Sequence, residues 1–214
     1  MHSKTLFRAL YYTLGMLILA LGLTLNTKTG LGVSPIISLP YCVSEVFSLN
    51  FGNTTLVAYC VFVAIQFALR GKNARLYDLL QIPLSLVFTR VLNLYSVVFD
   101  VHFAHLWQNL LLLAVAIVCT GVGAAMTLDM KLVPNPGDGI VQALAEFFHR
   151  ETGLTKNLFD LLNVTLTFLL GLATGRFLCG IGIGTLLGVL GVGRVIAVFN
   201  KLCKETIVRQ AGIA

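Results

Sequence analysis

Charged side chains are scarce in this chain: Asp, Glu, Lys and Arg make up 11% of its 214 residues, whereas hydrophobic residues make up 57%. A soluble globular domain carries about 25% charged residues. The composition therefore excludes that class and favours an integral membrane protein. The apolar stretches leave no room for a large domain outside the membrane, so we expect one compact helical bundle.

Catalytic and cofactor motifs are also missing. The five cysteines form no CxxC pair, and the sequence has no HExxH, no P-loop and no recognisable Ser-His-Asp set. His102 and His105 stand three residues apart without a third ligand, so we predict no metal site. The net charge of +6 is not arranged as the basic face that nucleic-acid binding needs. We therefore predict no enzyme, no cofactor and no nucleic-acid partner.

The chain does contain long apolar runs. Lys4 and Arg8 precede the first run as in a signal peptide, but that run is long enough to span and lacks a convincing cleavage site. We therefore predict an uncleaved helix there. Six runs can each cross a ~30 Å hydrocarbon core, and they lie near residues 7–26, 54–70, 79–99, 106–128, 156–175 and 180–200. Two further stretches, 32–49 and 133–150, are broken by proline or glycine.

The basic residues indicate whether the two broken stretches also cross. With six crossings and a cytoplasmic N-terminus, eleven of the 15 basic residues fall on the cytoplasmic side, and only Lys28 and Arg176 fall outside. Eight crossings would split the loop charges almost evenly, which the positive-inside rule disfavours. We therefore expect six transmembrane helices in the lipid bilayer, with both termini in the cytoplasm.

The two halves of the chain match at an offset of 101 residues, as from Pro35 to Pro136. The matched pairs include Gly22 with Gly123, Pro35 with Pro136, Glu45 with Glu146, and Arg75 with Arg176. Units 1–100 and 101–214 then each contain a span, a broken segment and two more spans. Because three crossings is an odd number, the second unit would be inverted relative to the first, as in many secondary transporters.

The broken segments have the features of half-helices. Ser34-Pro35 and Asn135-Pro136 each resemble a helix cap followed by a first-turn proline. If both segments re-enter the bilayer, their N-termini would face each other near the midplane and favour an anion there. The alternative is a pair of amphipathic helices lying on the membrane surface, and the polar stripe of Asp138, Gln142 and Glu146 suits either arrangement.

Three motifs give the chain a family resemblance: Gly30-Leu31-Gly32-Val33-Ser34-Pro35, Pro134-Asn135-Pro136-Gly137-Asp138-Gly139 and Gly180-Ile181-Gly182-Ile183-Gly184-Thr185. With them the chain resembles the YitT/YczE family of bacterial multi-pass membrane proteins, and the YczE-like branch most closely. The resemblance covers nearly the whole chain. It implies a duplicated helical fold in the bacterial cytoplasmic (inner) membrane, but it supplies no substrate. That family commonly has tryptophan and aspartate where Ile36 and Ile37 stand here.

The expected architecture predicts a function. We expect a secondary transporter or channel for a small polar or anionic solute, bound at the midplane between the inverted units. The residues expected to bind the solute are Ser34, Pro35, Arg90, Asn135, Gly137, Asp138 and Gln142. The alternative is a membrane protein that transports nothing and binds a lipid or a partner protein.

Two features of the spans leave a choice open. Arg90 falls near the middle of the third run, where a charge usually faces a partner or water. It would either bind an anionic group or pair with Asp138, or form a structural ion pair. Gly180, Gly184 and Gly188 form two overlapping GxxxG steps, which serve close packing inside one chain or a seam between two copies in a homodimer.

Overall fold

The structure, a computed structural model, describes residues 2–213, with side chains from residue 4, and this part of the chain contains helices and no strand. The predicted set of six long apolar helices and two short ones is confirmed. By length and composition, six helices can cross a membrane. The six are α1 (His2–Lys28), α3 (Phe51–Arg70), α4 (Gln81–Val98), α5 (Leu106–Asp129), α7 (Thr152–Ala173) and α8 (Ile183–Phe199).

Short helical turns extend two of these helices. The 3-10 turns η1 (Gly71–Asn73) and η2 (Leu76–Leu80) connect α3 to α4. A π-helical turn, η3 (Asn200–Lys204), continues α8 into α9 (Glu205–Gln210), so the last candidate span runs from Ile183 to Ala211. It therefore ends well beyond the predicted 180–200.

The two broken stretches fold as helices of equal length. α2 (Pro35–Phe47) and α6 (Pro136–Phe148) each have 13 residues and begin with proline in the first turn. Each ends at a left-handed residue, Ser48 with φ 52° and His149 with φ 52°, and this conformation commonly terminates a helix. Equivalent residues of the two helices are 101 positions apart, so the sequence repeat is also a repeat of local structure.

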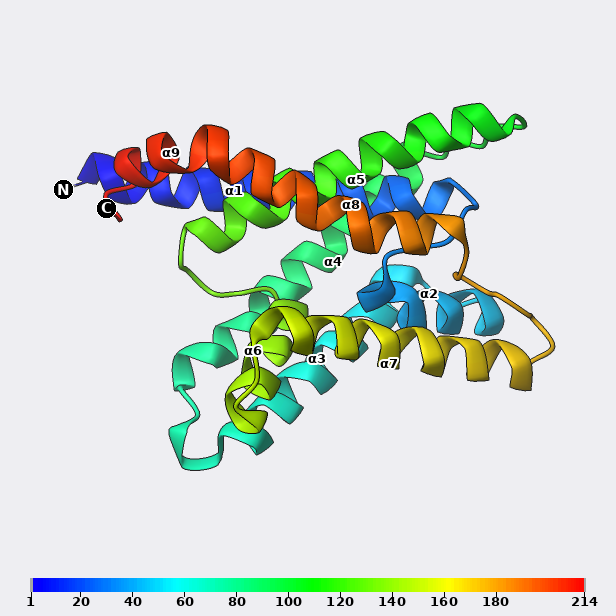
Figure 1. Cartoon of the computed structure of the whole chain (residues 1–214), viewed down its shortest axis with the longest axis horizontal. Helices are drawn as coiled ribbons and strands as arrows, with labels where there is room; N and C mark the ends of the chain where they lie inside the picture. The colour runs from blue at the N-terminus through cyan, green and yellow to red at the C-terminus, as the bar shows by residue number, and fades with distance from the viewer. Residues whose placement is uncertain (1, 214) are drawn as a thin grey trace.

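Both termini lie at one end of the bundle, together with the α3–α4 and α5–α6 linkers (Figure 1). The α4–α5 and α7–α8 connections lie at the opposite end. Arg8 Nε donates to the carbonyl oxygen of Met130 at 2.8 Å and so ties the start of α1 to the α5–α6 linker. We call this end, which carries Arg70, Arg75 and Lys131, the basic end.

Each short helix packs mainly on a long helix of the other half: α2 on α7, and α6 on α3. The two halves also meet where α1 crosses α5, which is the most extensive helix contact. A Cβ added at Gly22 or Gly123 would collide with the backbone of the opposite helix. Small residues at such a crossing let two backbones approach closely, because van der Waals packing rather than hydrophobicity drives helix association in lipid.

The first loop, between α1 and α2, forms backbone hydrogen bonds with the loop between α7 and α8 and with the start of α8. The Val33 amide donates to the Gly180 carbonyl at 2.9 Å, and the Gly184 amide donates to the Leu31 carbonyl at 2.7 Å. Added Cβ atoms at Gly180 and Gly184 would press on Tyr41 and on the first loop, so these two glycines face the chain's own interior. A Cβ at Gly188 would meet open space.

Candidate functional site

The buried start of α6 is the centre of the predicted site. Asn135 caps the helix, since its Oδ1 accepts a hydrogen bond from the Gly137 amide at 3.0 Å. Pro136, Gly137 and Gly139 are buried, whereas Asp138 is half-buried. This helix therefore begins inside the protein rather than lying on its surface.

The starts of the two short helices meet inside the bundle, but a methyl group fills the space between them. A Cβ added at Gly137 would collide with Cδ1 of Ile36, which belongs to the first turn of α2. The Ser34 side chain does not cap α2, and the Ser34 amide instead donates to Oδ1 of Asn26 at 2.8 Å. Ser34 and Pro35 therefore come close to the α6 cap, with Ile36 as the contact.

A buried pair of glutamines joins α3, α4 and α6 beside this point. Gln66 Nε2 donates to Gln81 Oε1 at 3.2 Å, and Gln81 Nε2 donates to Gln66 Oε1 at 3.0 Å. Gln66 Nε2 also lies 3.3 Å from the Pro136 carbonyl oxygen. A Cβ added at Gly139 would come within 2.6 Å of Gln66 Oε1, so glycine is required for this close approach.

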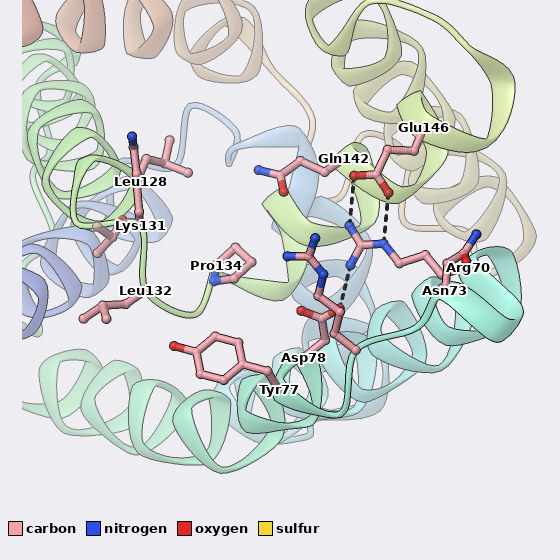
Figure 2. Close-up of a pocket in the computed structure, with 12 residues that line it drawn as sticks. Arg70, Asn73, Tyr77, Asp78, Leu128, Lys131, Leu132, Pro134, Gln142 and Glu146 are labelled. Atoms are coloured by element: carbon pink, nitrogen blue, oxygen red, sulfur yellow. Dashed lines mark hydrogen bonds and ion pairs between the residues drawn. The ribbon is translucent and has the colours of Figure 1, made fainter. Parts of the chain in front are cut away.

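A polar cavity of about 540 Å³ opens at the basic end (Figure 2). It lies between the α3–α4 linker, the end of α5, the α5–α6 linker and the polar side of α6. Figure 2 shows Gln142 and Glu146 on one wall and Tyr77 and Asp78 on another. The residues that line it are Arg70, Asn73, Arg75, Tyr77, Asp78, Thr127, Leu128, Lys131, Leu132, Pro134, Gln142 and Glu146.

The cavity carries an excess of positive charge. Arg70 is already occupied, because its Nη1 lies 2.7 Å from Asp78 Oδ2 and its Nε lies 3.1 Å from Glu146 Oε2. Arg75 and Lys131 also line the cavity, and their side chains form no ion pair with any described residue. Two cations are thus available to an anion that enters the cavity.

A narrow space continues from the cavity toward the α6 cap. Thr127 and Pro134 line both spaces, and the narrow one reaches Asn135, Pro136 and Gln81. Its volume is about 20 Å³, whereas one water needs roughly 10–15 Å³ of such volume. The path from the basic end is therefore wide at its entrance and too narrow for a solute at the start of α6.

Not all of the predicted site residues come together. Gln142 lines the cavity, and Asn135 lies at its inner end. Asp138 lies toward α7, within electrostatic reach of Lys156 and Asp160. Within the described residues, no three His, Cys, Asp or Glu side chains are grouped to hold a metal ion.

Of the three roles considered for Arg90, the pairing with Asp138 does not occur in the structure. Arg90 is exposed on the outer face of α4, and its Nη2 donates to Oδ1 of Asn53 at 2.7 Å. Asn53 stands in the first turn of α3, far along the helix from Arg70 at the basic end. A long arginine side chain can reach from an apolar face to a polar group near a helix terminus, and this reach accounts for its position outside the bundle interior.

Sequence reasoning missed the cavity. Arg70 and Lys131 support only the predicted orientation, Arg75 also belongs to the repeat, and Asp78 has no predicted role. The sequence signal that could have found them is the group of basic residues on two linkers that the six-span arrangement brings to one end.

Comparison with known proteins gives a family without an activity. The chain is 27% identical over 160 residues to "Uncharacterized protein YyaS" of Bacillus subtilis (strain 168), a match that covers 75% of this chain and 79% of the relative. No solved structure matches the chain significantly. The family model described as "Family of unknown function (DUF6198)" matches residues 6–201. The protein is therefore a member of the DUF6198 family.

Proposed function

We propose that this protein is a secondary transporter for a small anionic solute, which enters through the cavity at the basic end and binds at the start of α6. The observation that carries the proposal is the path from the available cations Arg75 and Lys131 to the buried helix start at Asn135. A helix N-terminus presents free N–H groups and a partial positive charge, which favour an anion.

We further propose that the basic end faces the cytoplasm of a bacterial cell and that the protein lies in the cytoplasmic membrane. Basic residues gather at that end, as they do on the cytoplasmic side of membrane proteins. The motifs at 30–35, 134–139 and 180–185 also support a relationship between this family and the YitT/YczE family.

The proposed mechanism uses the two units, which would stand inverted in the membrane. In this conformation the cavity is open at the basic end, and Ile36 packs against Gly137 in the first turn of α6. Rocking of one unit against the other would separate Ile36 from Gly137 and open the opposite side.

A flux measurement in proteoliposomes tests the proposal. The purified protein would be assayed with a panel of small radiolabelled anions, first as wild type and then as the double variant Arg75→Gln/Lys131→Gln. Each charge-assisted hydrogen bond contributes about 1.5–3 kcal/mol, so we expect the KM of the transported anion to rise at least tenfold (about 1.4 kcal/mol per tenfold).

The matched control is Lys72→Gln. Lys72 lies in the same α3–α4 linker and is exposed, but it does not line the cavity. It should leave the KM unchanged. An equal effect of the control and the double variant would mean that general surface charge, not the cavity, attracts the anion. Unchanged transport in the double variant would refute the proposed entrance.

A further inference from the structure

The second half of the protein has an open groove where the first half is closed. α3 and α4 pack against each other, but the equivalent helices α7 and α8 barely touch. The space between α7 and α8 is a groove of about 770 Å³, within the range of sites that bind small ligands. Its walls are largely apolar and include Leu161, Val164, Leu186 and Leu190.

One wall of the groove carries a buried carboxylate with one oxygen that lacks a hydrogen bond. Asp160 is 6% exposed, and its Oδ2 lies 3.2 Å from Lys156 Nζ. Its Oδ1 is also buried but has no hydrogen-bond partner in the described protein. Buried polar atoms are nearly always hydrogen-bonded, and an unsatisfied one is costly. Because Asp160 also lines the groove, a small movement of its carboxylate would present this acceptor to a bound molecule with a hydrogen-bond donor.

The other groups at this level of the groove are positive. Arg194 lines the wall formed by α8, and it makes no hydrogen bond or ion pair with the residues whose side chains are described. Pro35, in the first turn of α2, also lines the groove, so the positive end of that helix faces it. Arg194 is therefore an unpaired cation on the groove wall, which the phosphate of an anionic occupant would neutralise.

We propose that this groove binds an anionic glycerophospholipid whose head group carries a hydroxyl, namely phosphatidylglycerol. The phosphate would pair with Arg194, a hydroxyl of the head group would donate to Asp160 Oδ1, and an acyl chain would lie along the apolar walls. Basic pockets between transmembrane helices are a known way to recognise anionic lipids. Asp160 stands eight residues into α7, roughly 12 Å along the helix, so the head group is drawn below the membrane surface.

Native mass spectrometry of the full chain, released from nanodiscs, tests this site. The nanodiscs would contain phosphatidylcholine with equal minor amounts of phosphatidylglycerol and phosphatidylethanol. These two minor lipids carry the same charge and chains, but only phosphatidylglycerol has head-group hydroxyls. A hydrogen bond to a charged group predicts roughly tenfold or greater enrichment of phosphatidylglycerol on the wild-type protein.

Three variants and one control separate the contributions. Asp160→Asn should remove the preference for phosphatidylglycerol over phosphatidylethanol, and Arg194→Gln should remove the preference for both over phosphatidylcholine. Gly193→Phe should abolish retention, because Gly193 lines the groove and a Cβ there meets open space, so the ring can fill the groove. The control Gly153→Phe places the same ring on an open position in the first turn of α7, outside the groove.

The control should retain the lipid as the wild type does. Equal retention of the two minor lipids by the wild-type protein would overturn the proposed role of Asp160. Full retention by Gly193→Phe would show that the lipid binds elsewhere and would overturn the site itself. Because Gly193→Phe removes no polar contact, this second result stands even if Asp160→Asn does not fold.

Discussion

Arg70 forms two ion pairs, and variants of each partner test which pair stabilises the fold. Arg70 joins α3 to Asp78 in η2 and to Glu146 near the end of α6. The Arg70 side chain is 16% exposed, the Asp78 side chain 10% and the Glu146 side chain 63%. The pair with Asp78 is thus largely buried, whereas the pair with Glu146 reaches the solvent.

These exposures set the expected magnitudes. Arg70→Gln leaves the Asp78 carboxylate buried without its cation, and breaking such a pair costs about 3–5 kcal/mol. We expect Arg70→Gln to lower the free energy of unfolding by about 3 kcal/mol, at the low end of this range, because the cavity admits water to one side of the pair. Glu146→Gln removes an exposed partner, and such surface pairs contribute about 0–1 kcal/mol. The two ion pairs of this guanidinium therefore contribute very differently to the free energy of unfolding, because one partner is buried and the other is exposed.

The assay is equilibrium unfolding of the purified protein in mixed micelles, followed by circular dichroism as the fraction of denaturing detergent rises. The double variant Arg70→Gln/Asp78→Asn provides an internal check. It leaves no unpaired buried charge, since Glu146 is exposed to solvent, so it should be more stable than Arg70→Gln alone. A loss from Glu146→Gln as large as that from Arg70→Gln would refute the burial argument. The argument would also be refuted if the double variant lost as much stability as Arg70→Gln and Asp78→Asn lose together when each is measured alone.

Three further predictions concern other parts of the chain. Gly123→Ala should lower stability by about 1–3 kcal/mol because its methyl meets the backbone of α1, whereas Gly153→Ala, in open space, should not; unfolding of both variants checks this. Arg90→Leu should leave anion flux unchanged, and loss of flux would restore Arg90 to the site. Lys28, 2.9 Å from Asp100, lowers the pKa of that carboxyl, so the pair stabilises the fold above the ordinary carboxyl pKa and is lost as pH falls through the lowered value. A carbon NMR titration that gave an ordinary pKa would contradict this pairing.

The helices could be predicted because each depends on local signals. Apolar runs of sufficient length marked the six long helices, and a proline after Ser34 or Asn135 marked the start of each short one. The 101-residue repeat gave the equivalence of α2 and α6. These signals reside within one segment or in the comparison of two segments, so no knowledge of tertiary contacts was needed.

The site could be predicted only in part, because its geometry depends on the direction in which each helix face points. Arg90 and Asp138 are both charged residues in apolar surroundings, and their residue types do not indicate that they lie far apart. In the structure, one lies on an outer face and the other beside α7. The asymmetry between the closed α3–α4 pair and the open α7–α8 groove likewise depends on packing that residue types alone do not reveal.

The exchange of short helices between the two halves has a consequence for biosynthesis. α2 is complete at Phe47, but its main partner α7 ends at Ala173, and the loop that pairs with Val33 begins near Gly180. At a synthesis rate of roughly 5–20 residues per second, the nascent chain waits on the order of ten seconds for these partners. During that interval the Val33 amide and the Leu31 carbonyl lack their partners, so we expect the half-made protein to be open to membrane chaperones and quality-control proteases.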